Sequence, residues 1–208
     1  MISYVSGEFL EYVKDFKITN ERMCYLRLKA EWFSCILINV HAPTNEKTEE
    51  VKEKFYNLSG QHVNQMAISY IKIILGDFNA KVGKEDICKP TIGSESLHNE
   101  TNNNGIKMIQ FAISKGFNVR STTFPHNDIH KETCCSADSR TANKTDHILI
   151  SNRFRSAITD RALRGPDSGS DHKLLKINFK VKLRVKTEIK NCEYFSKLKV
   201  ETRICYGT

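Results

Sequence analysis

The chain has 208 residues, of which 39% are hydrophobic and 27% charged, with a net charge of +8 at pH 7. This length fits one large domain, and the apolar fraction suffices for a core, which argues against a wholly disordered chain. The sequence contains no run of roughly 18 uninterrupted apolar residues, the length that a membrane helix needs. The positive charge favours an anionic partner, with nucleic acid as the first candidate.

The seven cysteines and the N-terminus indicate the compartment. An odd number of cysteines, with Cys24 and Cys35 inside apolar runs, favours reduced thiols. The first residues lack a basic region followed by an apolar core, which a secretory signal would have. We therefore expect a soluble intracellular protein, nuclear or cytoplasmic and not secreted.

The first part of the chain predicts a strand–helix–strand unit. Residues 22–40 indicate two strands joined by a short turn, the first alternating and the second almost continuously apolar, as in a strand covered on both faces. Residues 44–58 predict a helix with acidic residues in its first turns and an apolar face formed by Val51, Phe55 and Leu58. Gly60 is expected to end or weaken this helix, and an apolar strand follows at 71–75.

The second part repeats this order. An Asn cap precedes a helix whose apolar positions are Ile106, Ile109 and Ile113, and Lys115-Gly116 is a typical C-terminal stop. Short strands are predicted within "FNVRSTTF" and at 146–151, and a long half-buried strand with one basic face at 174–186. Residues 187–208 lack a firm period and are interpreted as a tail or a short helix. Alternating strands and helices predict an α/β or α+β layered domain.

Polar residues end the strand in "IKIILGDFNAKVG". Asp77 and Asn79 are two positions apart, so side chains continuing the strand would point to the same side and could converge on a substrate. A carboxylate can accept a proton, and an amide both donates and accepts hydrogen bonds. The alternative is an Asx-type turn, in which Asp and Asn bond to their own backbone. These residues alone leave both interpretations open.

Two more segments place polar residues where a strand begins. Asp146 opens the strand "DHILIS", a costly position for a charge unless it is paired or faces water. Asp171 and His172 precede the strand at 174–186, where an Asp-His pair suits metal binding and imidazole chemistry, and an exposed turn is the alternative.

Taken together, these motifs resemble the endonuclease/exonuclease/phosphatase superfamily. "INVHAPTNE", "LGDFNAKVG", "TDHILIS" and "GSDHKLL" occur in the order typical of that superfamily. Within this superfamily, the chain more closely resembles the apurinic-type endonuclease domain of non-LTR retrotransposons and the related craniofacial development protein 2-like sequences. The resemblance covers about residues 1–186. It implies a four-layered α/β sandwich of the DNase I-like type, with residues 187–208 as a tail.

The resemblance implies metal-dependent hydrolysis of DNA phosphodiesters with Mg²⁺ or Mn²⁺. Asp77 would act on the attacking water or the leaving oxygen, and Asn79 would orient Asp77 or the phosphate. Asp171 would bind the metal, and His172 would contact the phosphate with its imidazole held by Asp146. His41 would contact the phosphate where many relatives have Tyr. The DNA phosphate backbone is the expected partner, with no membrane and no small-molecule cofactor, and the oligomeric state is left open.

Two departures from the family pattern lower the expected activity. The family's first strands, which carry an Asn and a metal-binding Glu, have no counterpart, so we interpret the domain as N-terminally truncated. Cys134 stands where relatives have an aromatic residue, and Lys144-Thr145 where they have an apolar one. We therefore expect a truncated copy with weak or no activity.

Two other functions compete with this hypothesis. A basic nucleic-acid-binding module without catalysis would use the lysine face of residues 174–186. A zinc site at His126, His130 and Cys134 is disfavoured, because structural zinc normally takes four ligands at tighter spacing.

Overall fold

A computed structural model of the chain describes residues 7–30, 33–128, 131–135, 142–163, 174–179 and 198–202. The helices are α1 (Glu49–Gln65) and α2 (Asn103–Lys115), with short 3-10 turns η1 (Gly7–Tyr12), η2 (Asp86–Cys88), η3 (Arg120–Thr122) and η5 (Asn152–Ala157). The strands are β1 (Val13–Asn20), β2 (Met23–Lys29), β3 (Ser34–His41), β4 (Ile71–Asp77), β5 (Phe117–Val119), β6 (Cys134–Cys135), β7 (Ala142–Asn143), β8 (Asp146–Ser151), β9 (Ile158–Leu163), β10 (Leu174–Phe179) and β11 (Leu198–Thr202). None of the helices in these ranges is long and apolar enough to cross a membrane.

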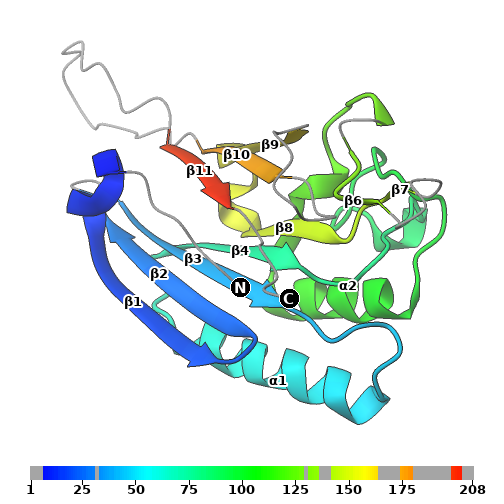
Figure 1. The fold of residues 1–208 in the computed structure, drawn as a ribbon, viewed down its shortest axis with the longest axis horizontal. Helices are drawn as coiled ribbons and strands as arrows, with labels where there is room; N and C mark the ends of the chain where they lie inside the picture. The colour runs from blue at the N-terminus through cyan, green and yellow to red at the C-terminus, as the bar shows by residue number, and fades with distance from the viewer. Residues whose placement is uncertain are drawn as a thin grey trace.

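A six-stranded sheet in the order β1-β2-β3-β4-β8-β5 forms the centre of the molecule (Figure 1). β3 and β4 are parallel, and α1 connects them, which confirms the predicted strand–helix–strand unit. The other neighbouring strands of this sheet are antiparallel. The predicted strand 146–151 is confirmed as β8, which lies between β4 and β5 although it comes much later in the sequence.

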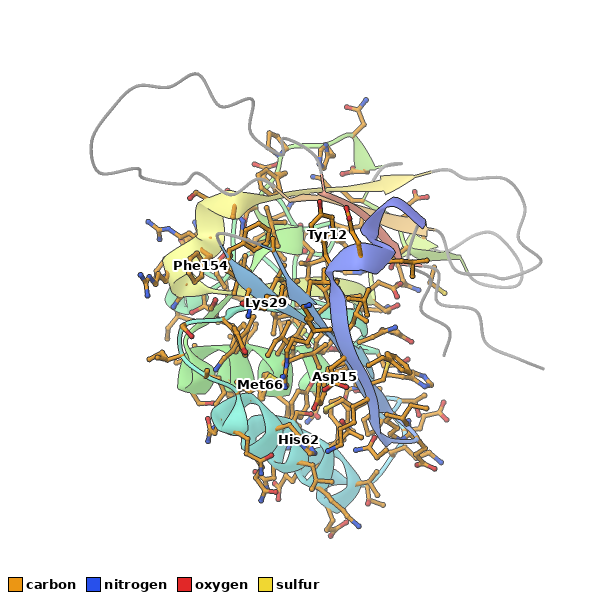
Figure 2. All side chains as sticks on the ribbon, turned by 90° about the vertical axis from the view of Figure 1, so that its left-hand side faces the viewer. Tyr12, Asp15, Lys29, His62, Met66 and Phe154 are labelled. Carbon is orange, nitrogen blue, oxygen red and sulfur yellow. The ribbon has the colours of Figure 1, made fainter. Side chains whose placement is uncertain are left out.

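The two faces of this sheet pack against different layers. Ile36, Ile38 and Ile74 belong to the core cluster on the helix side, together with residues of α1 and α2. Leu37 and Ile73, at alternate positions of the same strands, belong to the cluster on the opposite face. Because side chains alternate along a strand, the continuous apolar runs of β3 and β4 supply both clusters. The helices lie below the sheet and the β9–β11 sheet above it in Figure 2, which looks at the β1 edge where Asp15 is labelled.

The second sheet has the order β11-β10-β9, and Ile158 of β9 packs in the cluster that faces it. Strand β11 lies within residues 187–208, which were interpreted as a tail or a short helix. It pairs antiparallel with β10, so this part of the predicted tail is a strand. The described residues thus form three layers, one of helices and two of sheets. Residues 180–186 of the predicted long strand lie outside the described residues.

Helix α1 is longer than predicted and uses a different face. It continues through Gly60 to Gln65, so Gly60 does not end it, and the alternative that Gly60 weakens it stays a prediction. Gly60 is buried on the face of α1 that meets α2, where a Cβ would lie 2.8 Å from the flexible end of the Lys115 side chain. The buried residues of α1 are Lys52, Phe55, Ser59, Gly60 and Val63. Val51 is exposed and was wrongly assigned to the apolar face.

Helix α2 has the predicted ends and a partly wrong face. The side chain of Asn102 caps it by accepting from the Gly105 N–H, and Gly116 ends it in the left-handed conformation at φ +67°. Ile109 is buried as predicted, whereas Ile106 and Ile113 are exposed. Local end signals therefore located this helix better than its apolar pattern did.

Candidate active site

Three neighbouring strands carry polar side chains at the same level of the sheet, where β3 and β4 end and β8 begins. In the strand register, His41 of β3 lies opposite Asp77 of β4, and Asp77 lies opposite Asp146 of β8. We call these three residues the site rung. Asp77 and Asp146 are buried and His41 is half-buried. The sheet therefore brings together three of the predicted site residues, although they come from distant parts of the sequence.

The carboxylate of Asp77 has two different surroundings. Its Oδ1 accepts a hydrogen bond from the Asn79 N–H at 2.8 Å, which is the Asx-type turn that the sequence left open. Its Oδ2 lies 4.0 Å from Nε2 of His41. The turn and the site interpretation are thus compatible, because one oxygen holds the turn and the other faces the imidazole.

Asn79 lies beside Asp77 because of this turn. The strand ends at Asp77, and Asn79 has φ +49°, a left-handed conformation that Asn tolerates better than most residues. Its side-chain Nδ2 donates to the carbonyl of Ala42 at 2.9 Å, which joins the loop after β4 to the loop after β3. The two residues therefore converge by a turn, and the prediction that strand alternation brings them together was wrong about the cause.

A second level of the sheet lies directly beneath the site rung. It consists of Val40, Gly76 and His147, which we call the anchoring rung. Gly76 has φ +138°, and a Cβ there would lie 2.0 Å from the carbonyl oxygen of Val40. Only glycine fits this close approach of β3 and β4, which sets the position of Asp77 one residue later.

His147 fixes the other side of the anchoring rung. Its Nε2 lies 2.9 Å from the carbonyl oxygen of Ala80 and its Nδ1 lies 2.8 Å from the hydroxyl of Ser121. Because a carbonyl only accepts, Nε2 carries the proton and Nδ1 accepts from Ser121. Complete burial lowers the pKa of His147 to about 3, so this histidine is neutral at pH 7. It anchors the loop after Asp77 to β8.

Asp146 does not face water, contrary to the alternative that the sequence allowed. Its side chain is buried, and its backbone N–H donates to the hydroxyl of Thr133 at 3.2 Å. The same hydroxyl accepts from the Thr145 N–H at 3.1 Å, and Thr145 O accepts from the Phe78 N–H at 3.0 Å. Thr133 thus holds the start of β8, and Thr145 joins this start to the loop that follows Asp77.

The two positions that depart from the family pattern have different structural roles. Lys144 is buried and its ammonium donates to the carbonyl of Ser121, so a charged residue is accommodated where an apolar one was expected. Cys134 is half-buried at the start of the two-stranded β6–β7 hairpin. Lys144 therefore bonds inside the protein to Ser121, the residue that also contacts His147, whereas Cys134 is partly exposed to solvent.

The remaining predicted site residues are not described. Asp171 and His172 lie outside the described residues, so their placement relative to the site rung stays a prediction. His130 of the disfavoured zinc site lies outside them as well. Within the described ranges, no three His, Cys, Asp or Glu residues are grouped closely enough to hold a metal ion.

Two residues of the site region were not recognised from the sequence. His147 follows Asp146 directly, and strand alternation could have indicated that it points to the opposite, buried face. Asn104 is buried and its Nδ2 donates to the carbonyls of Pro43 and Asn79, each at 3.0 Å. No sequence signal indicated this role, because "NNNG" has the pattern of an ordinary helix cap.

The chain is similar in sequence to craniofacial development protein 2 of Bos taurus and of Tragulus javanicus. It is 32% identical to the Bos taurus protein over 170 residues, which are 81% of this chain and 28% of that protein. The match to the Tragulus javanicus protein has the same identity and covers 29% of it. The chain thus spans less than a third of the length of these curated relatives. No protein-family model matches it.

Solved structures show the same fold at low sequence identity. The endonuclease domain of TRAS1, a telomere-specific non-LTR retrotransposon, matches with a TM-score of 0.57 and 14% identity, over 85% of this chain and 76% of that domain. An endonuclease/exonuclease/phosphatase family protein from Leptotrichia buccalis matches with a TM-score of 0.52 and 14% identity, over 76% of this chain and 54% of that one. The predicted DNase I-like α/β fold is confirmed.

Proposed function

Since the chain is a homologue of craniofacial development protein 2 with the endonuclease/exonuclease/phosphatase fold, we propose that it hydrolyses phosphodiester bonds in DNA. The observation that carries this proposal is the site rung, in which a buried carboxylate faces an imidazole at the ends of β3 and β4, two inner strands of the central sheet. Such a pair can accept a proton from water and stabilise charge on a phosphate. The endonuclease domain of TRAS1, which shares this fold, is named for an activity that agrees with this chemistry.

Each residue of the site has a proposed task. Asp77 accepts a proton through Oδ2, because Oδ1 is held by the Asn79 N–H. The half-buried His41 donates a hydrogen bond to a phosphate oxygen, which suits its position at the open end of β3. Asp146 orients the imidazole of His172, which contacts the phosphate. This last step combines a described residue with one outside the described ranges.

A divalent cation, Mg²⁺ or Mn²⁺, would neutralise phosphate charge and make water more acidic. Carboxylate oxygens are the ligands that such ions prefer, so an acidic site such as this one suits the ion, with Asp77 and Asp146 beside it in the tasks given above. The described residues hold no group of three ligands. A complete ligand set would therefore include Asp171, as the sequence predicts.

We expect this hydrolysis to be slow. Cys134 offers much less stacking surface to a nucleotide than the aromatic residue that relatives carry, since an aromatic side chain buries about 150 Å² or more. Lys144 does not compensate, because its ammonium is bonded inside the protein.

Nicking of supercoiled plasmid tests the proposal, using intact plasmid and plasmid containing abasic sites, with Mg²⁺, Mn²⁺ or a chelator. We expect nicking that needs the metal and is lost in Asp77→Asn, Asp171→Ala and His172→Ala. Ser114→Ala is the matched control, because Ser114 is exposed near the far end of α2. Nicking that is equal in the variants would come from a contaminant and would contradict the proposal.

A second candidate function is DNA binding without cleavage. It is favoured by the net charge of +8 and by the lysines of residues 174–186. In that case DNA affinity falls steeply with salt and is unchanged in Asp77→Asn, while wild-type protein does not nick plasmid. No binding at low salt would eliminate this candidate.

A further inference from the structure

The N-terminal end of α2 lies against the loop that follows Asp77. The side chain of Asn102 accepts from the Lys81 N–H at 3.0 Å, and the Asn102 N–H donates to the Lys81 carbonyl at 3.1 Å. These bonds hold the start of the helix two residues beyond Asn79. The helix is therefore attached to the segment that carries Asp77 and Asn79.

Asn104 extends this attachment to the second site loop. Its Nδ2 donates to the carbonyl of Asn79 and to the carbonyl of Pro43, each at 3.0 Å. Asn79 follows Asp77 by two residues, and Pro43 follows His41 by two residues. One amide group thus joins both loops at equivalent positions relative to the two facing side chains of the site rung.

The surroundings of Asn104 indicate that its amide serves as a donor. Its side chain is 2% exposed, and its Oδ1 is buried without a hydrogen-bond partner among the described residues. The two carbonyls accept only, so they fix the orientation in which Nδ2 faces them. Burying an acceptor unsatisfied is unfavourable, and structures retain such a group where the rest of the side chain has a specific task.

Two other hydrogen bonds also connect these loops, and Asn104 bonds to carbonyl groups that these two bonds do not use. The Ala42 N–H donates to the Asp77 carbonyl at 2.8 Å, and Nδ2 of Asn79 donates to the Ala42 carbonyl. Both bonds lie next to the strands. The carbonyls of Pro43 and Asn79 lie farther along the loops, and both accept from the same Nδ2 of Asn104.

We propose that Asn104 is a positioning residue that sets the distance between His41 and Asp77 by bonding to both loops. Its catalytic consequence rests on the proposed function, whereas the joining of the loops does not. Loss of the amide leaves two carbonyls without this donor and lets the loops separate. Since a misplacement of about 1 Å can reduce a rate about 100-fold, a small separation has a large effect on catalysis.

Amide hydrogen exchange measured by NMR tests the joining of the loops without any need for activity. In Asn104→Ala, we expect the Ala42 and Asn79 N–H groups to exchange about tenfold faster, the effect of losing about 1.4 kcal/mol of local stability. Strand amides of Ile36 and Ile73 should keep their protection. Ile109→Val is the control, because it removes one buried methyl group from the same helix and leaves the amide of Asn104.

Two further variants complete the test, and the milder one, Asn104→Ser, keeps it decisive if Asn104→Ala does not fold. Asn104→Ser retains one donor and should give a smaller increase in exchange at the same two amides. Asn104→Asp has nearly the same shape without either donor, and it should be at least as damaging as Asn104→Ala. Exchange at Ala42 and Asn79 that equals the wild type in all folded variants would overturn the proposal.

Steady-state kinetics then separate this inference from the proposed function. If wild-type protein nicks DNA, Asn104→Ala should lower kcat about ten- to 100-fold with little change in KM, and Ile109→Val should not. An unchanged kcat would overturn the catalytic role of Asn104. Faster exchange in a protein that never nicks DNA would support the joining of the loops and contradict the proposed function.

Discussion

The site rung and the anchoring rung are one residue apart along the same strands, yet they have opposite properties. His41, Asp77 and Asp146 belong to the face that carries the second sheet, whereas Val40 and His147 point toward the helices. Alternation along a strand makes this possible, because neighbouring residues face opposite sides. The comparison teaches that the polar side of the site depends on a closely packed level of glycine, valine and a neutral histidine directly beneath it.

The two histidines illustrate the difference. His41 is half-buried and faces a carboxylate oxygen at 4.0 Å, so part of its imidazole stays accessible to a ligand. His147 is completely buried between a carbonyl and a hydroxyl, and its neutral form is the one that fits. Four predictions on folding stability test this contrast, in order of decreasing expected effect.

Gly76→Ala should have the largest effect. The new Cβ would lie 2.0 Å from the Val40 carbonyl oxygen in a backbone conformation that alanine rarely adopts. We expect a loss of more than about 4 kcal/mol of unfolding free energy, seen as insoluble protein or a collapsed urea midpoint. A soluble Gly76→Ala protein with a wild-type midpoint would contradict the described approach of β3 and β4. Gly116→Ala is the control for backbone strain without a clash, because Gly116 also has a positive φ, +67°, and a Cβ there meets nothing within 4 Å; it should cost less than Gly76→Ala.

His147→Phe should lower the unfolding free energy by about 2–4 kcal/mol, since Ala80 O and the Ser121 hydroxyl lose a buried partner. His41→Phe should change it by less than about 1 kcal/mol, because His41 is half-buried. Urea unfolding of both variants measures the difference. Equal losses would show that the two rungs do not differ as described.

Acid should destabilise the protein through His147. Its folded pKa of about 3 lies below the ordinary value of 6.5, so the unfolded chain binds the proton more readily. This contribution to stability is fully present above about pH 6.5 and decreases as the pH falls toward 3, by up to about 1.4 kcal/mol per pH unit. Urea unfolding of wild type and His147→Gln from pH 7 to pH 4 tests this, and the variant should show a shallower decrease.

Asp77→Asn should have the smallest effect on folding. The amide oxygen can still accept from the Asn79 N–H, so we expect a change of less than about 1 kcal/mol. The same substitution should abolish nicking, because an amide cannot accept the proton from water. If Asp77→Asn lost activity only because it unfolds, the contrast between a catalytic site rung and a structural anchoring rung would be contradicted.

The sequence located the strands and their polar ends well. Asp77 and Asp146 were each placed at a strand end, and β8 has the predicted bounds. Their adjacency was expected only from the family resemblance, because pairing of β4 with β8 is a long-range contact that no local pattern encodes. His147 was missed for a related reason, since a histidine in an apolar strand has no distinctive spacing.

The helices show where local patterns fail. Asn102 and Gly116 define the ends of α2, and the sequence predicted an Asn cap, without choosing among the three asparagines, and the Lys115-Gly116 stop. Gly60 is unfavourable in a helix by propensity, yet α1 continues through it and Gly60 is buried. Lys52 occupies a buried position on α1 because its ammonium reaches the Asn45 carbonyl at 2.9 Å. Tertiary contacts thus decided the face that periodicity misassigned.

The pairing of β4 with β8 also determines when the site can form during synthesis. The carboxylates of Asp77 and Asp146 belong to strands separated by a helix and several turns, so β4 leaves the ribosome long before its partner. Until β8 arrives, one edge of β4 has exposed N–H and C=O groups available to other strands, which favours aggregation. A nascent chain that stops before residue 146 would therefore lack both the site and the strand that covers this edge.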